Sequence, residues 1–167
     1  SYLPWEMTVS IVEMSIEDLE GRLNVRAHYW QGVLRLMDWN VKVVLKRSHE
    51  MKHPHALGMN SWDMNRKASV ITMCSPEDLA AHNEAFDGEE NDYDVTLVHE
   101  LLHLHFAPFW PTNEDASVDE LPMEQAINLL SYALVALDRK EIVEPQVSEE
   151  TVEAEKATPT QPIGAYI

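Results

Sequence analysis

Residues 97–104 read Leu-Val-His-Glu-Leu-Leu-His-Leu, and this stretch decides how the rest of the chain is interpreted. His99 and His103 are four residues apart, so a helix places both imidazoles on one face, one above the other. The surrounding leucines and valine predict a helix that is buried on one side and spans about 93–106. Two neutral imidazoles held in this way can share one tetrahedral zinc ion.

Glu100 lies about 100° round the same helix from His99, because an α-helix has 3.6 residues per turn. Its carboxylate can therefore reach a zinc-activated water without being a metal ligand. From that position it can take a proton from the water and pass it to a leaving amine. The pattern thus predicts hydrolysis of peptide bonds with Glu100 as the general base.

The five-residue pattern His-Glu-X-X-His occurs twice, at 49–53 and at 99–103. Pro54 directly follows the first copy and disfavours a helix there, and the flanking residues are polar, so we expect a solvated loop. A metal-binding helix must be buried on one side to hold its ligands rigidly, and only the second copy has the apolar neighbours for this. The alternative for the second copy is a core helix whose histidines merely satisfy buried acceptors.

A catalytic zinc ion needs a third protein ligand and an open position. Phe106 and Phe109 stand where HExxHxxGxxH would have glycine and histidine, so that class of site is excluded. The chain then offers several carboxylates, and one of them, Glu124, lies 25 residues after His99 on the next predicted helix. The alternatives lie in the acidic loop before that helix: Glu114, Asp115, Asp119 and Glu120.

His-Glu-Leu-Leu-His at 99–103, followed by Glu-Gln-Ala-Ile-Asn at 124–128, resembles a minimal gluzincin metallopeptidase. It is similar to small predicted metallopeptidases of phage and bacterial genomes and, more distantly, to SprT-like proteases. The resemblance implies a Zn²⁺ ion bound by His99, His103 and Glu124, with Glu100 as the catalytic base. Asn128 stands where gluzincins often carry an acid, and it can orient His99 by accepting a hydrogen bond.

The predicted fold class is α+β and zincin-like, with one domain over residues 1–140. We expect a long N-terminal helix over 15–38, a small antiparallel sheet, the motif helix and a following ligand-bearing helix over about 122–139. Residues 141–167 are acidic and lack periodicity, which predicts a disordered tail.

The sheet is predicted from two strands, over 39–46 and 67–73. The segment 47–66 between them contains a single glycine and is expected to be a loop, with a short strand inside it as the alternative. A short helix is expected to begin at Pro76 and to end near Gly88. In zincin-like folds an edge strand before the motif helix pairs with the substrate, and 67–73 is the expected strand.

Further residues are candidates for the site. Tyr132 and His105 could stabilise the transition state, although Tyr132 is also a natural core residue and His105 a natural polar residue at a helix end. Trp110 is expected to line the cleft. Cys74 is expected to be a buried residue without a catalytic role.

The net charge of −17 argues against nucleic acid and anionic membranes as partners. We expect a protein or peptide substrate, and metal-dependent hydrolysis of a non-peptide bond is an open alternative. One cysteine, no apolar run of membrane-spanning length and no visible leader favour a cytoplasmic protein. The resemblance implies a bacterium or a phage-infected cell as its source. The main alternative function is a zincin-fold binding or regulatory protein with a structural or vestigial zinc ion. The oligomeric state is left open.

Overall fold

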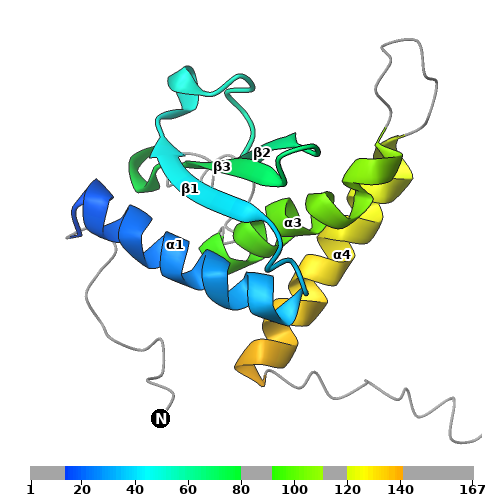
Figure 1. Ribbon diagram of the computed structural model, residues 1–167. Coiled ribbons are helices and arrows are strands. Elements are labelled where there is room, and N and C mark those ends of the chain that lie inside the picture. Colours follow the sequence, from blue (N-terminus) through cyan, green and yellow to red (C-terminus); the bar gives the residue numbers. More distant parts are fainter. Residues whose placement is uncertain (1–13, 80–91, 111–119, 141–167) are drawn as a thin grey trace, which may run out of the picture.

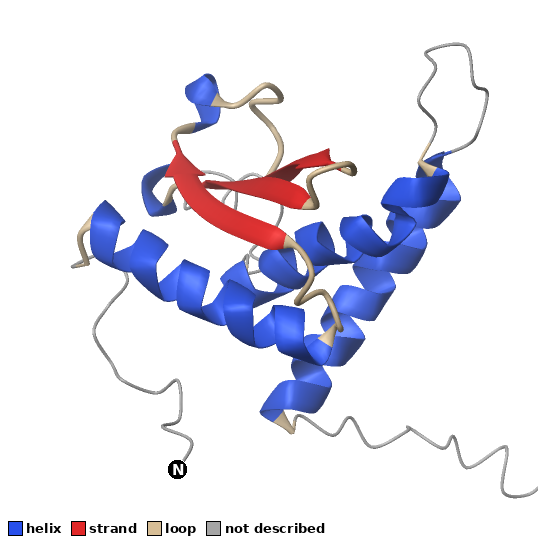
Figure 2. Cartoon of the chain, viewed as in Figure 1, coloured by secondary structure: helices blue, strands red, loops and turns tan. Residues whose placement is uncertain are grey.

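The structure is a computed structural model, and it describes residues 14–79, 92–110 and 120–140. This part of the chain contains helices and strands in the order α1 (Ile16–Val33), β1 (Asn40–Lys46), β2 (Gly58–Asp63), β3 (Ala68–Cys74), α3 (Tyr93–Phe106) and α4 (Glu120–Arg139). Two short 3₁₀ helices, η2 (Ser48–Glu50) and η3 (Ala107–Phe109), follow β1 and α3. The architecture is α+β, with the helices lying below a small sheet (Figures 1 and 2).

The sheet is mixed, and the prediction of an antiparallel sheet is wrong. Its strand order is β1-β3-β2, with β1 parallel to β3 and β2 antiparallel to β3. The short strand expected in the loop is β2, which forms a hairpin with β3, so β1 pairs with the other edge of β3. The expected edge strand, 67–73, is therefore the central strand, and β2 is the edge strand on the side of the motif helix.

Helix α1 begins as the sequence predicts, because the Ser15 side chain accepts a hydrogen bond from the Asp18 amide (3.1 Å). It ends at Val33 rather than near 38, and Arg35 then adopts a positive φ of 60°. Asn24 ties this helix to the outer edge of β1. Its amide nitrogen donates to the Val43 carbonyl, and its oxygen accepts from the Val43 amide, both at 2.9 Å.

Helix α3 runs beneath the sheet and carries the motif. The Asp92 side chain caps it by accepting from the Asp94 amide (2.8 Å). Arg26 of α1 binds the buried Asp94 carboxylate through two nitrogens, at 3.0 and 2.8 Å, which anchors the first turn. Its buried apolar residues then join the common core below the sheet: Leu97, Val98, Leu101, Leu102 and Leu104.

Helix α4 packs along α3, and its last turn meets α1, where Arg26 donates a hydrogen bond to Asp138 at 3.3 Å (Figure 1). Ile127, Ser131 and Val135 form its buried face, at the spacing of successive turns. The predicted helix start at Pro76 is confirmed, whereas its end near Gly88 lies outside the described residues. The same holds for the predicted tail over 141–167. None of the helices in the described part is long and apolar enough to cross a membrane.

Candidate metal centre

Three side chains from two helices meet at one point. His99 and His103 project from α3, and Glu124 projects from the second turn of α4. The Nε2 atom of His99 lies 3.3 Å from Glu124 Oε2, and that of His103 lies 3.6 Å from Glu124 Oε1. Ligands about 2.0–2.2 Å from a tetrahedral zinc ion are about 3.3–3.6 Å apart. The three residues, whose ligand atoms all lie within 4.8 Å of one another, are therefore a candidate metal site.

The placement of Glu124 follows from the buried face of α4. Glu124 stands one turn before Ile127, which is fully buried against the core, so the helix that buries Ile127 also turns Glu124 toward α3. Among the rival carboxylates, Glu114, Asp115 and Asp119 lie outside the described residues. The Glu120 side chain lies outside the described structure too, although its backbone begins α4.

The electrostatics favour neutral imidazoles, the form that binds metals. Burial lowers the pKa of His103 to about 4, and the neighbouring His99 adds to this shift. Burial also lowers the pKa of His99, although the Glu124 carboxylate and a hydrogen bond with Asn128 oppose the shift. Asn128 is therefore a hydrogen-bond partner of the His99 ring.

The two histidines are oriented by different means. His99 has Asn128 as its hydrogen-bond partner, as the sequence suggested for that position. The buried Nδ1 of His103 has no hydrogen-bond partner among the described residues. Its ring instead stacks on the Trp62 ring, with 6.2 Å between the ring centroids, and meets the Trp110 ring edge-on, with 5.0 Å between the centroids. Aromatic packing thus limits the rotation of His103, and Trp62 is a residue that the sequence did not single out.

Glu100 is buried beside the triad, with 5% of its surface exposed. Burial raises the pKa of its carboxyl to about 8, and the negative charge of Glu124 contributes to the shift. A cation held by the triad would offset the negative charge of Glu124 and so weaken the effect of that charge on the pKa of Glu100.

Strand β2 lies directly against the motif. Asn60 Nδ2 donates to the Glu100 carbonyl at 2.7 Å. A Cβ atom on Gly58 would lie 2.7 Å from Glu100 Oε1 and 2.8 Å from Thr96 Cγ2, so only glycine lets the strand approach this closely. Gly58 is the only glycine between 47 and 66, and this is the one feature of the sequence that could have indicated a close backbone approach here.

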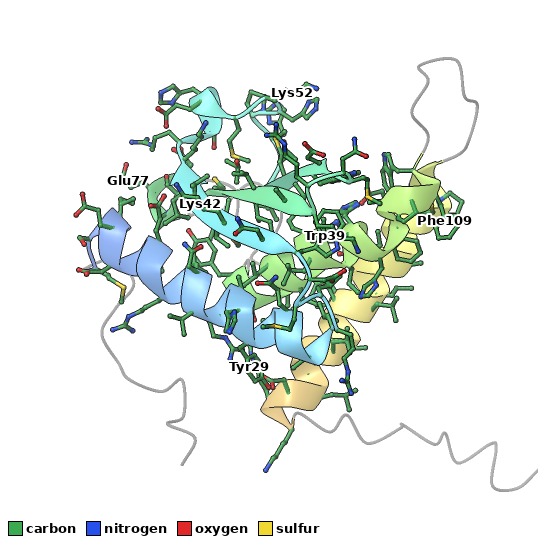
Figure 3. All side chains as sticks on the ribbon, in the orientation of Figure 1. Tyr29, Trp39, Lys42, Lys52, Glu77 and Phe109 are labelled. Atoms are coloured by element: carbon green, nitrogen blue, oxygen red, sulfur yellow. The ribbon has the colours of Figure 1, made fainter. Side chains whose placement is uncertain are left out.

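A pocket of about 540 Å³ opens in front of the triad. Glu100, Trp62 and Trp110 line it, so the expectation for Trp110 is met. The loop after β1 contributes Lys52, which Figure 3 shows at the end of the molecule above the sheet, and His53.

A second pocket of about 200 Å³ lies on the other side of His99 and Glu100, and Asn128 and Tyr132 line it. Tyr132 is 53% exposed, so it is not a core residue. His105 lies elsewhere: its Nε2 atom is 2.9 Å from the Leu34 carbonyl, and it lines neither pocket. Cys74 is buried, as predicted, and burial raises the pKa of its thiol.

Comparison of the chain with protein-family models, with curated proteins and with solved structures finds no match. The arrangement of the site's own residues must therefore carry any assignment of function.

Proposed function

We propose that this protein is a zinc metalloendopeptidase of the gluzincin type, with His99, His103 and Glu124 as the metal ligands. The observation that carries the proposal is Glu100, a buried carboxylate that adjoins the candidate triad and lines the same pocket without belonging to the ligand set. A structural zinc site needs no such group, whereas hydrolysis needs a base at this place.

A zinc ion on this triad would supply a Lewis acid that polarises a carbonyl group and makes water more acidic. The protein's own residues then divide the remaining work. Glu100 accepts a proton from water at its carboxylate and delivers it to the nitrogen of the leaving amine. Asn128 holds the His99 ring through its hydrogen bond, and Trp62 and Trp110 hold the His103 ring.

The pocket favours an extended peptide as the substrate. Gly58 and the four residues after it belong to β2 and line the pocket, and β2 pairs with β3 at its other edge. A peptide can add to this strand by backbone hydrogen bonds while its side chains contact the pocket. This proposal transfers the substrate-binding role from 67–73, the central strand, to β2.

The test measures zinc content and the cleavage of a peptide library by the wild type, Glu100→Gln and Glu50→Gln. Glu50 is the matched control, because it occupies the same place in the first copy of the motif. We expect all three proteins to bind zinc. We expect Glu100→Gln to lose at least about 100-fold in kcat/KM and Glu50→Gln to match the wild type.

Two results would contradict the proposal. One is a zinc-loaded wild type that cleaves no peptide of the library, which would favour a structural or regulatory role for the metal. The other is equal cleavage by the wild type and Glu100→Gln, which would remove Glu100 from the chemistry.

A further inference from the structure

The outer face of α4 is unusually apolar for so acidic a protein. Leu129, Leu130 and Leu137 are 72%, 45% and 74% exposed, and Ala126 and Ala133 beside them are exposed as well. No charged residue occurs between Gln125 and Leu137, although the chain carries a net charge of −17. A continuous apolar surface of this kind marks an interaction site.

The spacing of these residues matches a helix-pairing seam. Ala126, Leu130, Ala133 and Leu137 follow one another at intervals of four, three and four residues, which is the a/d spacing of paired helices. Large and small side chains alternate along the seam. Such a seam needs a partner with the opposite alternation, so that each leucine fits over an alanine.

A second copy of α4 in antiparallel orientation supplies that partner. In one register Leu130 lies opposite Ala133 of the second copy, and Leu137 lies opposite Ala126 of the second copy. A two-fold axis between residues 131 and 132 generates the same pairs in reverse, so the surface is complementary to itself. We propose that the protein is a homodimer whose interface is this face of α4.

The ends of the helix suit the same orientation. The antiparallel register brings Lys140 within about one helical turn of the backbone position of Glu120 in the second copy. The C-terminal end of one helix then lies beside the N-terminal end of the other, so the helix dipoles oppose each other favourably. A parallel pair would instead bring like charges together at both ends.

The interface has room to extend beyond the seam. Helix α4 has 20 residues and so spans about 30 Å. Leu129 flanks the seam, and Figure 3 shows Phe109 pointing away from the body of the molecule beside the first turns of α4. A stable dimer buries about 800 Å² on each partner, which a helix pair with such flanking contacts can approach.

The first experiment measures the molar mass of the full chain by light scattering and sedimentation, up to about 100 µM. We expect a dimer. We expect Leu130→Glu/Leu137→Glu to weaken association by at least about 100-fold, because each carboxylate would be buried without a partner. Val25→Glu is the matched control, since Val25 is 70% exposed on α1, outside the seam, and this variant should remain a dimer.

The second experiment tests the register by disulfide cross-linking. Within one helix, positions 126 and 137 are about 16 Å apart, too far for a disulfide, whereas across the proposed axis they face each other. Ala126→Cys/Leu137→Cys should form a covalent dimer under mild oxidation, and each single variant should form far less. A monomeric wild type overturns the proposal. The proposal is also overturned if the double glutamate variant is still a dimer and circular dichroism shows that this variant is folded.

Discussion

The chain contains two His-Glu-X-X-His segments, and the structure treats them differently. At 99–103 the backbone is helical throughout, and the two imidazole rings lie 5.1 Å apart on one face. At 49–53 the short helix η2 ends at Glu50, and Met51 is already extended, with ψ of 146°. His49 and His53 therefore share no helical face, and the described residues form no metal-ligand cluster around them.

The two glutamates differ as strongly as the histidines. Glu100 is buried beside the triad, whereas the exposed Glu50 accepts a hydrogen bond from the Arg47 amide at 3.0 Å and so serves as a local cap. The comparison teaches that the pattern specifies ligands only when its helix is buried. The first segment still reaches the same pocket, because Lys52 and His53 line its rim.

Replacing one histidine in each segment should give the largest difference between the two segments, and the difference should appear in zinc affinity. We expect His103→Ala to weaken zinc binding well beyond the roughly 10–100-fold loss typical of outer-shell partners, because it deletes a direct ligand. His53→Ala should bind zinc as the wild type does. Competition titration with a chelating dye measures both affinities, and equal losses would mean that the segments are not functionally distinct.

The fourth residue of each His-Glu-X-X-His segment tests whether that segment is packed into the core. Leu102 is buried, and we expect Leu102→Ala to reduce the free energy of unfolding by about 2–5 kcal/mol through lost apolar contacts and a cavity. Lys52 occupies the same position in the first segment and is exposed, so Lys52→Ala should stay within about 0.5 kcal/mol. Urea unfolding measures both values. A small effect at Leu102 would show that the motif helix is not part of the core.

Gly58 connects the two regions, because it begins the strand that follows the first segment and touches Glu100 of the second. Gly58→Ala places a methyl group 2.7 Å from Glu100 Oε1, so strand and side chain must move apart. We expect about 1–3 kcal/mol of destabilisation and reduced peptide cleavage. Gly32→Ala is the control, since a Cβ there meets no atom within 4 Å. Wild-type stability and activity for Gly58→Ala would contradict the close approach.

The smallest expected effect concerns the orientation of His99. Asn128→Ala removes the hydrogen bond to this ring, and zinc affinity should fall by about 10-fold while the fold remains intact. Asn128→Asp should restore or exceed wild-type affinity, because a carboxylate is also an acceptor. A zinc titration that finds no difference among the three proteins would exclude an orienting role.

Several features of the fold were predictable because they depend on neighbours in the chain. The bounds of α3 match the predicted 93–106, since apolar residues at helical spacing lie within the segment itself and Pro108 follows it closely. Strands β1 and β3 fall within one residue of 39–46 and 67–73. The choice between the two His-Glu-X-X-His segments also rested on adjacent residues, with Pro54 against one and leucines in favour of the other.

The sequence by itself determined the motif helix, its buried side and the shared face of His99 and His103, because helix geometry links residues three and four apart. Only the tertiary structure decided the strand order, the approach of Gly58 to Glu100 and the packing of Trp62 on His103. The short strand expected within 47–66 could not be given bounds or a pairing partner, because β2, Gly-Met-Asn-Ser-Trp-Asp, faces a pocket and a neighbouring helix and so lacks the apolar alternation of a core strand. The distance from Glu124 to both histidines likewise depends on how two helices pack, which no local pattern encodes.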